Sequence, residues 1–293
     1  MKLSIYQESR IGGRAYNQDR LVIAHSRDAV MLAVADGMGG HLRGEVAAQI
    51  TVDLLSELFY QQATPLLTHP NRFLVNAVST AHQVILDYAA DHRLPEVPST
   101  TVVAAIIQQG QLYWCHVGDS RLYLLDDKGL RLRSRDHSQV QRLIDQGQLS
   151  EDAAKVHPER HKIYNCLGAA SDPDIDVGEK QSVGAGCSIL LCSDGLWSQV
   201  MDPELEKVFV RRNVSQVLPA LMNVAERRAG AGGDNLSAAA VTLLDETQDY
   251  GEREDVLDTE KATPRQLGRM ILDSNLETMH QEILASRVAG KHD

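Results

Sequence analysis

The chain has 293 residues, 43% of them apolar, with 29 lysine and arginine residues, 40 aspartate and glutamate residues, and a formal net charge of −11. This length and apolar fraction suffice for one large domain with a buried core, and they exclude a disordered or fibrous chain. The acidic balance argues against a nucleic-acid partner, because binding to a phosphate backbone depends on clustered lysine and arginine.

Targeting signals are missing from the sequence. The N-terminus has no apolar stretch of signal-peptide length, and no run of about 18 apolar residues occurs anywhere. The four cysteines have no zinc-site spacing and are too few for a disulfide framework, so we expect them to be reduced and mostly buried. The sequence therefore predicts a cytoplasmic protein without a membrane partner.

Strand-like and helix-like patterns come in blocks along residues 1–244. Apolar runs of strand length occur at 30–35, 101–107, 112–117, 122–125, 188–192 and 236–244. Glycine-containing turns at 108–110 and 126–129 predict hairpins, and therefore a largely antiparallel sheet. Helical spacing occurs at 45–60, 72–91 and 215–228. This order predicts an α+β layered fold rather than a doubly wound parallel sheet.

The pattern changes over residues 136–166, which we call the lobe. Gly147 would end a first short helix and Ser150 would cap a second, so the lobe is predicted to be an inserted helical unit. We expect the histidines of this region to be solvated rather than ligands: His137, His157 and His161.

The segment 245–262 is strongly acidic. It carries eight acidic and two basic residues, which is −6 of the total charge, and residues 1–244 carry only −5. So many charges with so few apolar residues predict a solvated acidic linker after a folded domain at 1–244.

Beyond the linker, the sequence predicts an amphipathic helix over 263–293. Thr263 fits an N-cap, Pro264 the first helical position, and Gln266 completes a capping box. This helix either packs back on the domain or binds a partner or a second copy of the chain through residues 263–289.

Five aspartates stand at the ends of the strand-like runs, most of them beside glycine: Asp19, Asp36, Asp119, Asp194 and Asp234. A carboxylate at a strand end is held by a rigid scaffold, and a neighbouring glycine lets backbone or ligand approach closely. Each motif alone is an ordinary turn. Five carboxylates in one place would repel one another unless cations held them, and oxygen ligands favour magnesium or manganese over zinc. Spacing alone leaves open whether the five converge.

The order of these motifs points to a family. In chain order they are Arg14-x-x-Asn17-Gln18-Asp19, Asp36-Gly37-Met38-Gly39-Gly40-His41, Ser99-Thr100-Thr101, Gly118-Asp119-Ser120-Arg121, Ser193-Asp194-Gly195 and Gly233-Asp234-Asn235. Over about residues 1–244 the series resembles the metal-dependent protein phosphatases of type 2C, in the form of their bacterial branch. The resemblance implies a four-layer αββα sandwich, in which helices flank two central antiparallel sheets and the metals lie at one end.

The resemblance also implies an activity and a set of metal ligands. The activity is hydrolysis of phosphoserine and phosphothreonine in proteins, by direct attack of a hydroxide that bridges two Mn or Mg ions. On the family pattern Asp36 bridges the two ions, and Asp194 and Asp234 hold the first. The Gly37 carbonyl and, through a water, Asp19 hold the second.

Three further implications complete the expected site. Asp119, with Asp194, matches a weaker third-metal position. Arg14 matches the phosphate-binding arginine, since its planar guanidinium suits bidentate contact with phosphoryl oxygens. His41 is the candidate general acid, because the ordinary pKa of histidine lies near neutral pH. With Asp36 these two form the expected catalytic set, and the expected partners are phosphoproteins and an opposing serine/threonine kinase.

The chain departs from the family pattern at one informative place. Ile11 stands where relatives usually have glycine, so the turn that presents Arg14 is expected to differ in shape. The lobe corresponds to the family's flap beside the active site, where it either gates substrate or is a passive surface unit.

Other interpretations fit less well. Cys115 to Arg121 matches C-x-x-G-x-x-R, the phosphate loop of cysteine-dependent phosphatases, but a strand-like run follows where that loop needs a helix. Gly37-x-Gly39 is a partial dinucleotide motif that lacks its third glycine. A binding module without activity would be expected to lose its metal carboxylates, and all are present.

Overall fold

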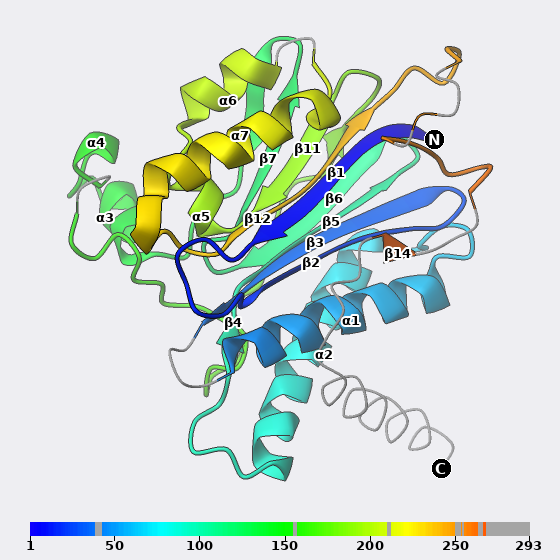
Figure 1. Ribbon diagram of the computed structural model, residues 1–293. Helices are drawn as coiled ribbons and strands as arrows, with labels where there is room; N and C mark the ends of the chain where they lie inside the picture. Colours follow the sequence, from blue (N-terminus) through cyan, green and yellow to red (C-terminus); the bar gives the residue numbers. More distant parts are fainter. Residues whose placement is uncertain are drawn as a thin grey trace, which may run out of the picture.

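The computed structural model describes residues 1–38, 43–154, 157–209, 212–249, 253, 255–262 and 266–267. Two antiparallel sheets face each other, and helices cover the outer face of each (Figure 1). One sheet runs β13 (Val256–Asp258), β1 (Lys2–Arg10), β12 (Leu236–Leu243), β11 (Ser188–Cys192), β7 (Arg121–Asp126) and β8 (Gly129–Arg133). The other runs β10 (Gln181–Ser182), β6 (Gln111–Val117), β5 (Val102–Gln108), β3 (Ala29–Met38), β2 (Asp19–His25) and β14 (Gln266–Leu267). Two short strands lie off this path, β4 (Ser99–Thr100) on β3 and β9 (Asp176–Val177) on β6.

The helices form the two outer layers. The β2–β3 sheet is covered by α1 (Gly44–Gln62) and α2 (Pro70–Asp91), which also pack on each other. The opposite sheet is covered by α5 (Asp194–Trp197), α6 (Asp202–Phe209) and α7 (Val214–Ala229), which ends in the 3-10 turn Gly230–Gly232. The predicted α+β, four-layer αββα sandwich is confirmed.

Three buried apolar layers hold these elements together. The first lies between α1, α2 and their sheet and includes Phe59 and Ile85. The second fills the space between the sheets, where Ile23 and Ile189 belong, and the third lies under α7 around Leu218. Burying a side chain of this size contributes about 1.5–3 kcal/mol, so these layers supply the stability of a fold with few aromatic residues.

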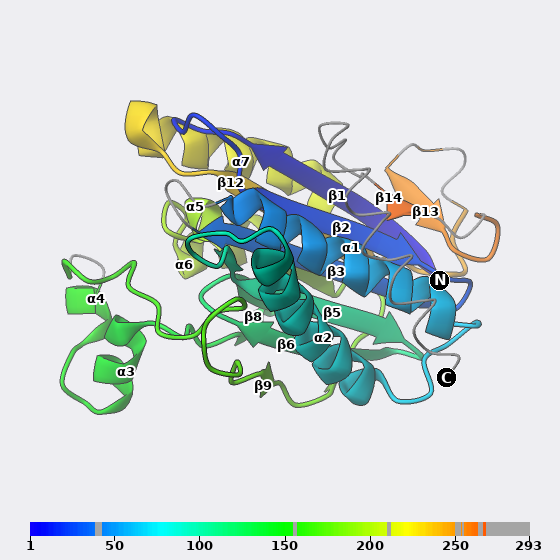
Figure 2. The same cartoon turned by 90° about the horizontal axis from the view of Figure 1, so that it is seen from below.

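The lobe stands apart from the sandwich at one end (Figure 2). It contains α3 (Gln139–Asp145) and α4 (Glu151–Ala154). Ser138 caps α3 by accepting a hydrogen bond from the Gln141 N–H, and Ser150 accepts one from the Ala153 N–H at 3.2 Å. The two short helices expected here are therefore present.

The C-terminal segment corrects one expectation. Residues predicted to be a solvated acidic linker include β13, which pairs with β1 and buries Leu257 between the sheets. Thr259 binds the start of the chain, because the Met1 amino group donates to its Oγ1 at 3.0 Å. The linker prediction is wrong for residues 256–258, where backbone pairing with β1 and the burial of Leu257 produce an edge strand inside an acidic segment.

The predicted C-terminal helix is corrected at its first turn. Gln266 and Leu267 form β14, whose partners on β2 are Ala24 and Ile23. At these two positions the backbone forms hydrogen bonds to the exposed edge of β2 instead of the hydrogen bonds of a helix. The rest of the segment 263–293 lies outside the described residues.

Candidate active site

The five predicted aspartates lie at one end of the sandwich, because antiparallel neighbours alternate in direction. Strands β1, β3, β6 and β11 end there, and β2, β7 and β12 begin there. Asp19 begins β2, Asp36 lies near the end of β3, and Asp194 follows β11. Asp119 connects β6 to β7, and Asp234 precedes β12.

Asp19 and Asp36 are direct partners across β2 and β3, so their side chains point to the same face of the sheet. Asp19 is fully buried; its Oδ2 accepts a hydrogen bond from Ser193 Oγ at 2.7 Å, and its Oδ1 has no hydrogen-bond partner. The Asp36 carbonyl accepts hydrogen bonds from the Thr101 N–H and the Thr100 hydroxyl, both at 2.9 Å. These contacts hold both aspartates on a rigid base.

Gly37 is required by the close approach of three backbone segments. A Cβ at this position would lie 2.3 Å from the Gly44 carbonyl oxygen and 2.7 Å from that of Gln18. The Gly37 N–H also donates to the Gln18 carbonyl at 3.2 Å. The end of β3 can therefore pass between the start of α1 and the loop before β2 only without a side chain.

The gathered carboxylates repel one another. Burial and the charges of the other four aspartates raise the pKa of Asp36 well above its ordinary value. Burial, opposed by serine hydroxyls, raises the pKa of Asp19 from 3.8 to about 7. Burial and the charge of Asp194 likewise raise the pKa of Asp119. Such a cluster needs protons or cations to balance its charge.

The residues of the cluster fit divalent metal ions. Their donors are carboxylate oxygens, which magnesium and manganese prefer. The buried Asp19 Oδ1 is a ligand position that no protein group satisfies. The donor set and this unpartnered oxygen are therefore consistent with the predicted cofactor.

A loop after β1 places Arg14 at the rim of the cluster. Arg14 Nη2 lies 2.5 Å from Asp234 Oδ2, and 57% of the arginine side chain is exposed. Asn235 holds the loop, because its amide donates to the carbonyls of Ile11 at 2.8 Å and Tyr16 at 3.0 Å. Sequence reasoning assigned Asn235 no role, although its position directly after a predicted ligand was a usable signal.

The loop of Asp119 is held by Trp197, Arg121 and Asp136, to which sequence reasoning assigned no role. Trp197 Nε1 donates to the Asp119 carbonyl at 2.9 Å. The Arg121 guanidinium stacks 3.7 Å from the centre of the Trp197 ring and donates to both oxygens of Asp136, at 2.8 and 2.7 Å. Gly118 precedes Asp119 with φ of 101°, a conformation that favours glycine. No local sequence signal marks this long-range stack.

The histidines divide into two groups. The candidate general acid His41 lies in residues 39–42, outside the described part of the chain. His161 is half exposed, as expected, but its Nδ1 lies 3.6 Å from Asp194 Oδ2, so the lobe reaches the rim of the aspartate cluster.

A second group of potential ligands lies at the base of the lobe. His116, His137 and Asp176 each offer an atom within 4.8 Å of the others. His116 Nε2 lies 2.7 Å from the Arg135 carbonyl, and His137 Nδ1 accepts a hydrogen bond from the Asn165 amide at 2.7 Å. His137 is buried, so the expectation that it is solvated is wrong. The first contact joins β6 to the residue just before the lobe, and the second joins the two ends of the lobe to each other.

The cysteine-phosphatase interpretation fails on the structure. Cys115 is fully buried in β6, and burial raises the pKa of its thiol to about 12. Strand β7 follows the loop, where a phosphate loop of that class needs a helix. The described residues contain no membrane-spanning candidate, because none of their helices is both long and apolar enough.

A sandwich with clustered carboxylates at one end of its sheets and an arginine at the rim is the architecture of a metal-dependent phosphoester hydrolase. Residues 6–239 match the family described as protein phosphatase 2C. The chain belongs to this family, whose members are metal-dependent serine/threonine protein phosphatases. The family that its motifs predicted is confirmed.

Individual bacterial proteins agree with this assignment. The chain is 32% identical over 232 residues to the serine/threonine phosphatase stp of Listeria monocytogenes, which covers 78% of this chain and 90% of the relative. The crystal structure of the Mycobacterium tuberculosis serine/threonine phosphatase PstP/Ppp superposes with a TM-score of 0.73 at 31% identity, over 84% of this chain and all of that one. The PstP catalytic domain in complex with two manganese ions gives 0.71 at 30% identity, over 83% of this chain and 99% of that one.

Proposed function

We propose that the chain hydrolyses phosphoserine and phosphothreonine in proteins at the aspartate end of its sandwich. The observation that supports this most strongly is that five aspartates, separated by up to 215 residues of sequence, gather beside an exposed arginine. The Listeria relative is named a serine/threonine phosphatase, and a related catalytic domain carries two manganese ions.

The proposed metal ligands follow the family pattern. Asp36, Asp194 and Asp234 would hold one divalent cation, and Asp36, the Gly37 carbonyl and, through a water, Asp19 would hold a second. Asp119 belongs to a weaker third position. Cations of this kind, Mn or Mg, would supply an activated water for direct attack on phosphorus and would neutralise phosphoryl charge, so that no phosphoenzyme is needed.

The scaffold keeps these carboxylates in place before any ligand arrives. The Ser193 hydroxyl holds one oxygen of Asp19 and leaves the other available. The hydrogen bonds from Thr100 and Thr101 fix the backbone of Asp36. Preorganised charges avoid reorganisation during the reaction, which is the main source of electrostatic catalysis.

Arg14 binds the phosphoryl group in this proposal. Its guanidinium contacts Asp234 in the structure, but its side chain is more than half exposed and can turn toward a second anion. Two parallel N–H donors then orient the phosphoryl oxygens. His41 donates a proton to the leaving seryl or threonyl oxygen.

The expected result is turnover that depends on manganese. The purified chain should hydrolyse p-nitrophenyl phosphate and a phosphothreonine peptide with Mn²⁺ and lose both activities in EDTA. Asp36→Asn should lower kcat by about a thousandfold or more, the scale of losing a central electrostatic group. The matched control Asp127→Asn, on the exposed turn between β7 and β8, should keep the wild-type rate.

Two results would refute the proposal. Activity that persists in EDTA would exclude a metal mechanism, and normal turnover by Asp36→Asn would exclude this site. For His41, the test is His41→Asn, which should flatten the alkaline limb of the kcat profile. That limb reports a general acid in the enzyme–substrate complex.

Three partner and location predictions accompany this function. We propose a serine/threonine kinase as the enzyme that phosphorylates the same substrates, and a cytoplasmic location, which free cysteines favour. Association through residues 263–289 also stays a prediction.

A further inference from the structure

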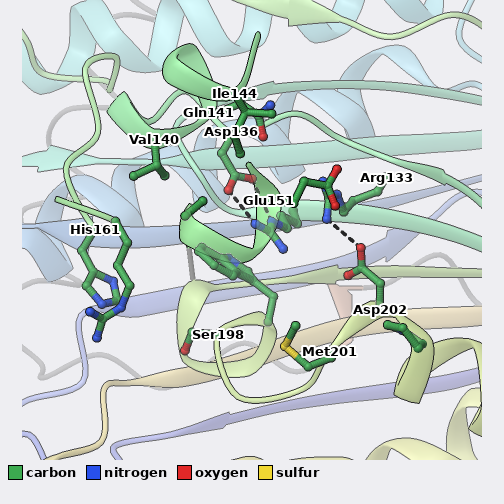
Figure 3. A pocket seen from close by; sticks show the side chains of 15 residues that line it. Arg133, Asp136, Val140, Gln141, Ile144, Glu151, His161, Ser198, Met201 and Asp202 are labelled. Atoms are coloured by element: carbon green, nitrogen blue, oxygen red, sulfur yellow. Dashed lines mark hydrogen bonds and ion pairs between the residues drawn. The ribbon is translucent and has the colours of Figure 1, made fainter. Parts of the chain in front are cut away.

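A cavity of about 400 Å³ lies between the lobe and helices α5 and α6 (Figure 3). Val140 and Ile144 of the lobe lie on one side, and Ser198 and Met201 lie on the other. This volume is in the range of ligand-binding clefts, about 300–1,000 Å³. The metal-centre residues proposed above do not line it.

The polar groups at the floor of the cavity are already paired. Arg121 donates to both oxygens of Asp136 at 2.8 and 2.7 Å and stacks on Trp197. Arg133 Nη1 lies 2.6 Å from Asp202 Oδ2. The indole N–H of Trp197 is used by the Asp119 carbonyl. A ligand bound in the cavity would therefore find few unsatisfied hydrogen-bond donors or acceptors at the floor.

The walls of the cavity offer apolar surface. Val140, Ile144 and Ala154 come from the lobe; Met201 directly precedes α6, and Pro203 lies in its first turn. Met201 is 38% exposed, which is unusual for a side chain of its size in this fold. Polar side chains line the cavity as well: Gln141, Glu151, Arg160 and His161. The aliphatic groups on both sides and the paired charges below provide a surface that suits an apolar side chain.

Helix α5 connects the cavity to the proposed active site. Asp194 is its first residue, and Trp197 and Ser198 at its other end line the cavity. His161 lines the cavity too, and its Nδ1 lies 3.6 Å from Asp194 Oδ2. Three residues of helix cover about 4.5 Å, and an extended peptide advances about 3.3 Å per residue. The cavity is thus within reach of about three residues on either side of a bound phosphoresidue.

We propose that this cavity is a substrate subsite, which takes one apolar side chain of the phosphoprotein, of leucine or methionine size, near the phosphorylated residue. The inference rests on the proposed function and adds a sequence preference to it. The lobe contributes one wall and α6 the other, so the preference depends on both. Met201 and Ile144 are specificity-determining residues in this proposal.

The test uses a set of phosphothreonine peptides. Each has alanine at the three positions on either side of the phosphothreonine, with leucine replacing one alanine at a time. We expect leucine at one position to raise kcat/KM about tenfold over the all-alanine peptide, the discrimination expected when a hydrophobic pocket recognises a few methyl groups. Comparing two peptides within each enzyme removes differences in folding or metal loading.

Two variants change opposite walls of the cavity. Met201→Gln and Ile144→Ser should each reduce the leucine-to-alanine ratio to about twofold or lower, because each places a polar group where the side chain would lie. Val97→Gln is the matched control, since Val97 is 37% exposed and lies outside the cavity. It should keep the wild-type ratio.

The outcomes separate this inference from the proposed function. If wild type hydrolyses p-nitrophenyl phosphate with Mn²⁺ but shows no leucine preference at any position, the subsite is overturned and the function stands. A preference that survives in both Met201→Gln and Ile144→Ser also overturns the subsite. If wild type hydrolyses neither p-nitrophenyl phosphate nor peptide, the proposed function fails and the subsite fails with it.

Discussion

Helix α5 joins the aspartate cluster to the cavity beside it, but the two regions differ in how their charged side chains are arranged. In the cluster, carboxylates face one another, and burial with mutual repulsion raises the pKa of Asp36. At the cavity floor, Asp136 and Asp202 each have an arginine within hydrogen-bond distance. The first region holds unbalanced negative charge and the second holds pairs.

The difference distinguishes aspartates suited to binding a cation, in the cluster, from aspartates that stabilise the fold, at the cavity floor. Buried like charges destabilise the folded chain until a cation or proton balances them. A buried pair stabilises the fold against removal of either partner, because the remaining charge would be left without compensation. Neutralising an aspartate should therefore have opposite effects on stability in the two regions.

The largest expected effect on stability is at the cavity floor. Asp136→Asn leaves the Arg121 guanidinium without its carboxylate, in a site where the two side chains are 7% and 12% exposed. Removing one partner of a buried pair costs about 3–5 kcal/mol, so the urea midpoint should fall clearly. Asp202→Asn is the control, since its pair with Arg133 is partly exposed and should contribute about 1 kcal/mol at most. Equal losses in the two variants would contradict this distinction.

The second effect is a pH dependence of the metal-free protein. Asp19 keeps its proton in the folded chain up to about pH 7 but releases it near pH 4 when unfolded. Unfolding therefore releases a proton between these values, and the free energy of unfolding falls as pH rises through this window. We expect a loss of about 2 kcal/mol between pH 5 and pH 7.5, measured by urea unfolding in EDTA.

The control for this pH effect is Asp19→Asn. This variant keeps the shape of the side chain and removes its titration, so the slope of stability against pH should become smaller. If metal-free wild type instead grew more stable from pH 5 to pH 7.5, the cluster would not hold repelling carboxylates.

The smallest effect tests how Asp19 is held. Ser193→Ala removes the hydroxyl that donates to Asp19 Oδ2 at 2.7 Å. A hydrogen bond of this kind contributes about 1 kcal/mol, so metal-free stability at pH 8 should fall by that amount. The loss should shrink at pH 5, where Asp19 is protonated. A loss that is independent of pH would show that Ser193 acts through packing instead.

Most strands that are buried on both faces were predictable, although the fully buried β2 was not among the predicted runs. The runs around Val103, Ile106 and Leu190 are continuous apolar stretches, and all became strands. Strand β1 was missed because most of it is partly exposed and carries polar residues such as Glu8 and Arg10. Its outward face binds α7, where Arg10 contacts Glu226 at 2.9 Å, a contact between distant segments that no local pattern reveals.

The proposed metal ligands of the site could be predicted from the sequence, but the residues that hold them in position could not. Asp36 and Asp194 stand in recognisable motifs at strand ends, so position along the chain and family resemblance sufficed. Trp197 lies close to one motif, but its contact with Asp119 depends on how α5 packs against another loop. The same limit explains why β13 was missed: Val256 and Leu257 lie in an acidic segment, and only pairing with the edge of β1 makes that segment a strand.

The most direct test of the account is thermal unfolding of wild type and Asp36→Asn at pH 8, each in EDTA and in Mn²⁺. Without metal the variant should melt at the higher temperature, because one of the repelling carboxylates is gone. Mn²⁺ should raise the melting temperature of wild type and of Asp127→Asn, and should leave Asp36→Asn nearly unchanged. Equal stabilisation of wild type and Asp36→Asn by Mn²⁺ would contradict the assignment of the aspartate cluster as the metal centre.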